Sequence, residues 1–354
     1  MKIIHAIFSF LTGGAETMLV DIMNQQCQET SVSLIIVNNK INTDLLKNID
    51  AKVNVFLLNR KAGSKLHLFK TFYKINKIVR RIQPDVIHCH DNMLFPFFIR
   101  WKQKTCITVH SINASTRFLN HYAKVFAVSA SVQEDIRKYT EVHATVIYNG
   151  IEVEQYKSRN DYEFDPTKET FHLIQISRLA LELKGQDIAI QAIHLLKKQH
   201  PNLKINLYFV GEGESSAELQ ALVTELNLQN HILFLGSVDR NWVKNNLQNY
   251  HLLIQPSRFE GFGLTVIEGF ACGLPVITSD LDGPKEIVDL LNSGALVEPN
   301  NPADLAQKIQ QIYEGYVSNL IKNSRYLILD KNRLKIFDIQ TTAKCYLNNY
   351  ISNN

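Results

Sequence analysis

Apolar and polar residues follow one another along the chain in a pattern typical of parallel α/β proteins. Short runs rich in β-branched residues alternate with segments in which apolar residues recur every three to four positions. Continuous apolar runs suit strands that are buried on both faces of a parallel sheet, and the segments between them suit right-handed helical crossovers. The predicted strands are 2–10, 31–37, 53–58, 86–90, 106–110, 125–129, 172–177, 205–210, 232–235, 252–255, 275–278 and 295–297.

A polar segment divides this pattern into two halves. Residues 156–170 carry many charges, contain Pro166 and show neither period, so we place the interdomain linker there. We predict an N-terminal Rossmann-like domain over residues 1–155, a second over residues 156–330, and a C-terminal helix within residues 331–354 that can pack back on the first domain. The predicted fold class is α/β, with two Rossmann-like αβα domains facing each other across a cleft.

Composition narrows the class of protein. Hydrophobic residues make up 45% and charged residues 20% of the 354 residues, which excludes a disordered or coiled-coil chain and suits two globular domains. No apolar run is long enough to span a membrane, and the first residues, which include His5 and Ser9, resemble a strand rather than a signal peptide. The five scattered cysteines form no C-x-x-C pair, so we predict a reduced, cytoplasmic protein without a disulfide framework.

Basic residues are concentrated in the first half of the chain. Residues 1–150 contain 19 Lys and Arg against 10 Asp and Glu, whereas the remainder contains 19 against 24. The densest stretch, residues 60–83 from Arg60 to Gln83, has eight basic residues and no acidic one. On a helix, Leu68, Phe72, Ile75, Val79 and Ile82 would form a core face, while Leu66, Phe69 and Tyr73 would fall on another face beside Lys70, Lys77 and Arg80.

Aromatic residues flanked by cations suit the surface of an anionic membrane. We therefore expect this helix to dock on the inner face of the plasma membrane, with a solvated basic helix as the alternative. Nucleic acid is not an expected partner, because no recognised nucleic-acid-binding module accompanies the basic residues.

The strongest candidate for chemistry lies in residues 256–268, after the strand 252–255. Gly261 and Gly263 allow a loop to approach a ligand closely, and a helix over 264–271 would present free N–H groups at its start. Glu260 lies on the loop and Glu268 about one turn into the helix, so both can face one cleft. Carboxylates beside an anion site are suited to accept hydrogen bonds from hydroxyls, such as those of a sugar and a ribose.

Two further segments follow predicted strands and contain phosphate-binding residue types. Arg178 and Lys184 lie between the strand 172–177 and a helix starting near Asp187, at the strand edge where α/β sheets bind ligands. Residues 11–16, Leu-Thr-Gly-Gly-Ala-Glu, form a glycine turn after the first strand. This turn is neither G-x-G-x-x-G nor a Walker loop, so a nicotinamide dehydrogenase and a P-loop ATPase are not supported.

These three segments, in this order, resemble the retaining glycosyltransferases of family 4, which have the GT-B fold and use nucleotide sugars to build bacterial surface polysaccharides. Glu260 and Glu268 match the family's E-x7-E motif, and residues 13–16 resemble its N-terminal glycine loop. The similarity extends over nearly all of the chain and is strongest from residue 172 to residue 299. One departure is that Arg178 and Lys184 are six positions apart, where many relatives have five.

The resemblance implies how a nucleotide sugar, expected to be UDP-linked, would be held. Arg178 and Lys184 would bind the diphosphate, Glu260 the hydroxyls of the transferred sugar, and Glu268 the ribose. His110 would face the sugar or the incoming hydroxyl, so the implied catalytic residues are Glu260, His110, Arg178 and Lys184. The other implied donor contacts are Gly14 at the distal phosphate, Gly236 and Val238 beside the base, and Phe262, Gly263 and Leu264 along the phosphates and the sugar.

The implied activity is retaining, metal-independent transfer of a hexose or N-acetylhexosamine to a lipid-linked, lipopolysaccharide or capsule glycan. The alternatives are a nucleotide-sugar 2-epimerase or hydrolase of the same fold and a non-catalytic sugar-nucleotide-binding subunit. No cofactor is expected. Asp280 and Asp282 have the D-x-D form of a metal motif but lie in a turn-rich loop that uses Asp for its own capping. In the sequence His88-Cys89-His90, Cys89 would point away from both histidines, which favours a buried strand over a zinc site.

Overall fold

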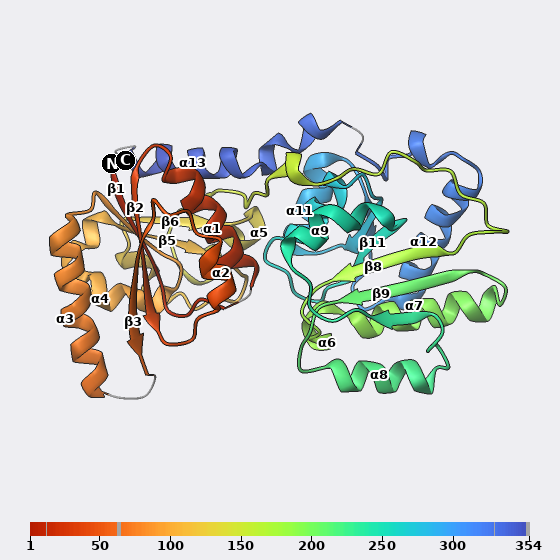
Figure 1. Cartoon of the computed structure of the whole chain (residues 1–354), viewed down its shortest axis with the longest axis horizontal. Coiled ribbons are helices and arrows are strands. Elements are labelled where there is room, and N and C mark those ends of the chain that lie inside the picture. The colour runs from red at the N-terminus through yellow and green to blue at the C-terminus, as the bar shows by residue number, and fades with distance from the viewer. Residues whose placement is uncertain (12, 62–64, 329, 352–354) are drawn as a thin grey trace. The chain divides into compact units, whose positions relative to one another are not determined.

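The computed structural model describes residues 1–11, 13–61, 65–328 and 330–351, with side chains except at residues 65–67 (Figure 1). The chain forms two compact units. The first consists of Met1–Ile151 together with Ile336–Asn354, and the second of Glu152–Lys335. None of the helices in the described ranges combines the length and the apolar character that a membrane span requires.

The first unit is built on a parallel sheet. Among the described residues the strand order is β3-β2-β1-β4-β5-β6-β7. Strand β1 lies inside this order, where it pairs with β2 on one side and with β4 on the other. The strands are β1 (Lys2–Ile7), β2 (Ser31–Asn38), β3 (Asn54–Arg60), β4 (Val86–Cys89), β5 (Thr105–Val109), β6 (Lys124–Ala127) and β7 (Ala144–Val146).

Helices cover this sheet and the chain's last helix returns to it. The helices are α1 (Gly14–Gln26), α2 (Thr43–Lys47), α3 (Lys65–Ile82), α4 (Phe95–Phe98), α5 (Ala130–Tyr139) and α13 (Ile339–Ile351). In Figure 1 α13 lies beside α1, and the two helices are in contact. Gly150 passes so close to this returning segment that a Cβ there would lie 2.5 Å from the Thr342 hydroxyl and 2.8 Å from the Asp338 carbonyl oxygen.

The second unit has its own parallel sheet, in the order β10-β9-β8-β11-β12-β13 for the described residues. Its strands are β8 (Phe171–Ile176), β9 (Ile205–Val210), β10 (Ile232–Phe234), β11 (Leu252–Gln255), β12 (Val276–Ser279) and β13 (Ala295–Val297). Its helices are α6 (Leu181–Lys184), α7 (Gln186–Gln199), α8 (Ser216–Glu225), α9 (Arg240–Asn246), α10 (Leu264–Ala271), α11 (Asp282–Leu291) and α12 (Pro302–Val317). Buried aliphatic side chains of β8, β9 and β11 pack against α7 and α12 in one core.

The α/β class with parallel sheets is confirmed, and the differences from the predicted elements are local. Strand β7 was not predicted. The predicted linker is wrong for most of its length, because its aromatic side chains are anchored in the second unit. Tyr162 is buried and donates a hydrogen bond of 2.8 Å to the Gly273 carbonyl, and Phe164 packs edge-on against Phe171 and His251.

Each sheet has a switch point, where the chain changes from building one side of the sheet to building the other. In the second unit this point lies between β8 and β11, and in the first between β1 and β4. Open α/β sheets bind ligands at the carboxyl ends of the strands beside such a point. Arg178 and Lys184 follow β8 and Glu260 follows β11, so the candidate residues of the second unit lie there.

Candidate active site

The loop after β11 is fastened to the short helix α6. Gly185 ends α6 with a φ of +63°, and a Cβ there would lie only 2.0 Å from the Pro256 carbonyl oxygen. Only glycine fits this left-handed position at such close approach. The backbone amides of Arg258 and Phe259 both donate to the Leu183 carbonyl, at 2.8 and 3.1 Å. The end of α6 and the glutamate loop are therefore held as one surface.

Arg258 strengthens this connection, although sequence reasoning did not identify it. Its guanidinium pairs with both carboxylate oxygens of Asp187, at 2.8 and 2.7 Å, and donates to the Leu181 carbonyl at 2.6 Å. The hydrogen bonds to Asp187 raise the pKa of Arg258. A bidentate pair of this kind adds geometric specificity as well as energy.

Lys184 and Glu260 meet on that surface. The Lys184 Nζ lies 2.5 Å from a Glu260 carboxylate oxygen, and their side chains are only 22% and 20% exposed. The Lys184 carbonyl in turn accepts a hydrogen bond of 2.8 Å from Gln175 Nε2. An ammonium and a carboxylate are thus placed together at the switch point, where one can bind an anion and the other can accept hydrogen bonds from hydroxyls.

Arg178 is held differently. Its guanidinium pairs with Glu214 at 2.8 Å, and the two side chains are 66% and 57% exposed. The loop that contains Glu214 lies against the loop after β8, since a Cβ on Gly211 would come 2.1 Å from the Ser177 carbonyl oxygen. Arg178 is therefore paired with an exposed carboxylate. Such a surface ion pair is weak, and an incoming phosphate can replace Glu214.

Glu268 lies inside α10 and binds a tyrosine that sequence reasoning missed. The Tyr156 hydroxyl donates a hydrogen bond of 2.7 Å to Glu268 Oε1. Burial, and then the charge of Glu268, raise the pKa of Tyr156 well above its usual value, so this hydroxyl stays protonated as a donor. No sequence pattern marks this pair, because Tyr156 lies in the segment that we interpreted as a linker.

The remaining donor candidates of the second unit lie on neighbouring loops. Gly263 precedes α10 with a φ of +104°, and Leu264 is the first residue of the helix. Phe262 is buried, and α11 packs so closely here that a Cβ on Gly283 would lie 2.4 Å from the Phe262 Cα. Gly236 accepts a hydrogen bond of 2.8 Å from the Gly211 amide, and Val238 follows on the same loop, half-buried.

In the first unit, Gly14 opens α1 directly after Gly13. The Glu16 carboxylate folds back over this turn, where it accepts hydrogen bonds from the backbone amides of Glu16 and Leu11 and would lie 2.5 Å from a Cβ on Gly13. Burial raises the pKa of Glu16. An acidic group thus already lies at the start of α1. Thr12, part of the predicted glycine turn, lies outside the described residues.

His110 follows β5 and belongs to a group of histidines of which His5 and His88 are fully buried. Its Nε2 lies 3.2 Å from His90 Nδ1, while its own Nδ1 is buried without a hydrogen-bond partner among the described residues. Burial lowers the pKa of His110 to about 4, so its ring is neutral near pH 7.

The two candidate metal motifs have other partners. Asp280 forms a salt bridge of 2.5 Å with Lys285 on α11. His88 binds Tyr350 and Thr108 on one face of the sheet, whereas burial raises the pKa of Cys89, which contacts Tyr122. The predicted alternation of these side chains is confirmed.

The basic segment forms α3, and its outer face is partly as predicted. Phe69 and Tyr73 are 76% and 69% exposed, whereas Ile75 and Val79 are buried in the core. The prediction that Leu68 belongs to the core face is wrong, because its side chain is 44% exposed in the first turns of the helix. The side chains of Lys65 and Leu66, which belong to the predicted basic helix, lie outside the described part of the structure, and so do residues 62–64.

Family models and relatives match both units of the chain. The model described as Glycosyl transferases group 1 matches residues 157–326, and that described as Glycosyltransferase Family 4 matches residues 12–155. An uncharacterized glycosyltransferase of Methanocaldococcus jannaschii is 31% identical over 260 residues, which cover 68% of this chain and 69% of that protein. The lipopolysaccharide 1,6-galactosyltransferase of Escherichia coli is 24% identical, over 86% of this chain and 87% of that protein.

A solved structure extends the likeness to the whole fold. Anabaena HepE in complex with UDP and glucose superposes with a TM-score of 0.81 at 22% identity, covering 100% of both chains. Both sheets, their switch points and the two family models thus lead to one assignment. The chain belongs to the family 4 glycosyltransferases, which have the GT-B fold.

Proposed function

We propose that the protein is a retaining glycosyltransferase that moves a hexose or N-acetylhexosamine from a UDP-sugar to a lipid-linked, lipopolysaccharide or capsule glycan. Two relatives support the substrate classes, since one is named a lipopolysaccharide 1,6-galactosyltransferase and another was solved with UDP and glucose. The observation that carries the proposal is the contact between Lys184 and Glu260 at the switch point of the second sheet.

In this proposal the pair separates when the donor binds. The diphosphate attracts the Lys184 ammonium, and Glu260 is left to accept hydrogen bonds from the hydroxyls of the sugar. Arg178 exchanges its exposed partner Glu214 for a phosphate oxygen, and Glu268 accepts from the ribose. The amides of Phe262, Gly263 and Leu264 line the phosphates, since they lie at the start of α10.

The reaction breaks the bond between the anomeric carbon and the phosphate oxygen and forms a bond to the acceptor oxygen. Negative charge grows on the departing diphosphate as positive charge grows on the sugar ring. Fixed cations and amides stabilise that negative charge more in the transition state than in the ground state, which is why they accelerate transfer. Cationic side chains supply this stabilisation, so the proposed reaction requires no metal.

On the acceptor side, α3 supplies the proposed membrane contact. Exposed Phe69 and Tyr73 share the helix with Lys70, Lys74 and Lys77, which are also exposed. Apolar rings can enter the headgroup region while the ammonium groups meet anionic lipids. This contact would hold the first unit at the surface where a lipid-linked acceptor lies.

The test begins with binding and ends with turnover. UDP-glucose, UDP-galactose, UDP-N-acetylglucosamine and GDP-mannose are screened by thermal shift, and each binder is then assayed with lipid-linked acceptors. Replacing Lys184 by Met should lower kcat by about 10²–10³, the loss typical of one electrostatic group at a developing oxyanion. Lys204→Met is the matched control, because Lys204 binds the Thr167 carbonyl beside the start of β9.

The alternatives give different results in the same assay. Free sugar or an epimerised product without acceptor would indicate a hydrolase or epimerase. Binding of a nucleotide sugar without any turnover would indicate a non-catalytic subunit. An inverted anomeric configuration in the product, measured by NMR, would contradict the retaining mechanism, and equal kcat values for Lys184→Met and the wild type would contradict the assigned role of Lys184.

A further inference from the structure

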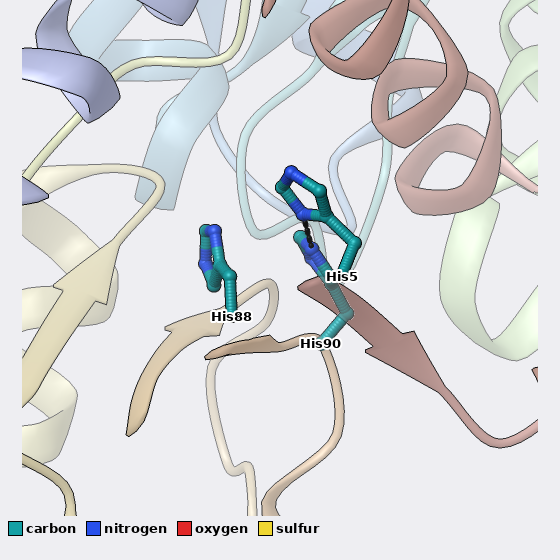
Figure 2. A group of neighbouring side chains, drawn as sticks. All are labelled: His5, His88 and His90. Carbon is teal, nitrogen blue, oxygen red and sulfur yellow. Dashed lines mark hydrogen bonds between the residues drawn. The ribbon is translucent and has the colours of Figure 1, made fainter. Parts of the chain in front are cut away.

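Four histidines meet at the carboxyl edge of the first sheet. His5 lies on β1 and His88 on β4, opposite each other in the parallel register, while His90 and His110 follow β4 and β5. Figure 2 shows that His5, His88 and His90 turn toward one another. The ring centroids of His88 and His90 are 4.4 Å apart, and those of His5 and His90 are 5.3 Å apart.

Three of these rings form one line of hydrogen bonds that starts at Gln26 on α1. Gln26 Oε1 lies 2.8 Å from His5 Nε2. His5 Nδ1 lies 3.0 Å from His90 Nε2, the bond drawn in Figure 2. His90 Nδ1 lies 3.2 Å from His110 Nε2. His5 and His90 therefore each use one nitrogen toward the previous group and the other toward the next, and His110 uses Nε2 alone.

All three rings are neutral near pH 7. Burial is the largest cause that lowers the pKa of His5 to about 4 and of His110 to about 4, and it lowers the pKa of His90 well below its usual value. A neutral imidazole has one N–H donor and one acceptor nitrogen. A line of neutral rings can therefore run in only one of two directions, and the group at its end decides which.

Gln26 sets the direction. Its Oε1 has no proton, so it accepts the Nε2–H of His5 and leaves His5 Nδ1 as an acceptor. His90 must then donate from Nε2 and accept at Nδ1, and His110 must donate from Nε2. The other end of the Gln26 amide, Nε2, is buried without a hydrogen-bond partner among the described residues.

We propose that Gln26, His5 and His90 are positioning residues that fix the tautomer of His110, so that its Nδ1 holds a lone pair for a hydroxyl of the sugar or the acceptor. The unpartnered Nδ1 of His110 is the free end of the line. A buried acceptor without a partner is costly, and a donating hydroxyl removes that cost. The inference rests on the proposed function, since it takes the partner of His110 to be a substrate hydroxyl.

The same histidines have the spacing of a metal site, which is a competing use. One ligand atom from each of His5, His88 and His90 can be chosen so that all lie within 4.8 Å of one another. However, His88 uses Nδ1 toward the Tyr350 hydroxyl at 2.6 Å and Nε2 toward the Thr108 hydroxyl at 2.7 Å. A metal would also need a lone pair of His90, whereas in the line of hydrogen bonds His90 Nε2 carries a proton and His90 Nδ1 accepts from His110 Nε2.

The tautomers can be read directly, without substrate. In wild-type protein labelled with ¹⁵N-histidine, two-bond ¹H–¹⁵N spectra at pH 7.5 should show His5, His90 and His110 protonated at Nε2 and not at Nδ1. A protonated Nδ1 on His110 overturns the proposal. So does stoichiometric binding of Zn²⁺ alone that removes the Nε2 proton of His90.

Kinetics then link the tautomer to turnover. Gln26→Met should give a mixture of tautomers at His110 and lower kcat at least about ten-fold without changing the donor KM, since a ring in the wrong tautomer cannot accept. Gln25→Met is the matched control, because Gln25 lies on the same helix and makes no side-chain hydrogen bond within the described structure. His90→Gln should retain more activity than His90→Phe, because an amide can donate to one neighbour and accept from the other.

The outcomes separate this inference from the proposed function. If the tautomers are as expected but Gln26→Met turns over like Gln25→Met, the positioning role is wrong and the glycosyltransferase assignment stands. If no nucleotide sugar is turned over by the wild type, the proposed function fails, while the spectra still report whether the hydrogen bonds run in the stated direction.

Discussion

Mild acid should destabilise the first unit, because its sheet buries neutral histidines. Burial lowers the pKa of His5 and that of His110 from 6.5 to about 4. Between these values the unfolded chain binds protons that the folded unit does not bind, so the free energy of unfolding falls as the pH falls. Well above pH 6.5 both states are neutral at these rings, and the full stability is present. Each histidine contributes a slope of about 1.4 kcal/mol per pH unit within the window.

The expected loss is large relative to a domain's stability. From pH 6.5 to pH 5 the two rings together remove about 3 kcal/mol, compared with the roughly 5–15 kcal/mol of a typical folded domain. Burial also lowers the pKa values of His88 and His90 well below normal, which adds in the same direction. Burial raises the pKa values of Glu16 and Asp91, so the folded unit takes up protons there and offsets part of the loss as the pH approaches 5.

The assay follows the first unit through its own tryptophan. The chain has two tryptophans, and replacing Trp242 by Phe leaves Trp101 as the reporter of urea unfolding. Unfolding free energies at pH 7.5, 6.5, 5.5 and 5.0 should fall by the stated amount, and His5→Gln should make the slope shallower by about 1.4 kcal/mol per pH unit. His143→Gln, at an exposed position, is the control. A stability that stays constant between pH 6.5 and 5 would refute the reasoning.

Other perturbations address the second unit and the basic helix. Gly185→Ala should lower the melting temperature and the donor affinity together, since a Cβ there meets a backbone oxygen at 2.0 Å; an unchanged thermal scan would contradict that contact. Glu268→Ala should weaken donor binding in calorimetry, whereas Glu260→Ala should also lower kcat, and identical effects on affinity alone would rule out this division. Turnover should survive EDTA, and activity that returns only with added Mg²⁺ would exclude metal-independent transfer. Co-sedimentation with vesicles should rise with anionic lipid, fall with salt and weaken in a Phe69→Ser, Tyr73→Ser variant.

Most strands of the two sheets could be predicted from the sequence, because they are buried on both faces and therefore form continuous apolar runs. Strand β7 (Ala144–Val146) is three residues long and has one exposed position, Thr145, so it lacks such a run. The segment before β8 was misinterpreted for a related reason. Its charged residues dominate the composition, while Tyr162 and Phe164 anchor it at single buried positions that follow no period.

The residues of the candidate site could likewise be predicted where they belong to a local motif, but not where their role depends on a distant contact. The residues that a local motif joins, such as Lys184 beside a glycine and Glu260 in a glycine loop, could be selected because backbone freedom and charge are visible in a few neighbouring letters. The contacts that decide what those residues can do join distant parts of the chain. Arg258 finds its carboxylate 71 positions away, and Tyr156 finds Glu268 112 positions away.

The histidines depend on distant residues even for their chemical state, that is, for which ring nitrogen carries the proton. Nothing near His110 in the sequence determines which of its nitrogens carries the proton. That choice is set through His90, then through His5 on a neighbouring strand, and finally by an amide on α1. A motif can select the ring that meets a substrate, but only the assembled sheet and helix determine whether that ring donates or accepts. Substitutions at Gln26, far from any motif, are therefore the sharpest way to ask what His110 does.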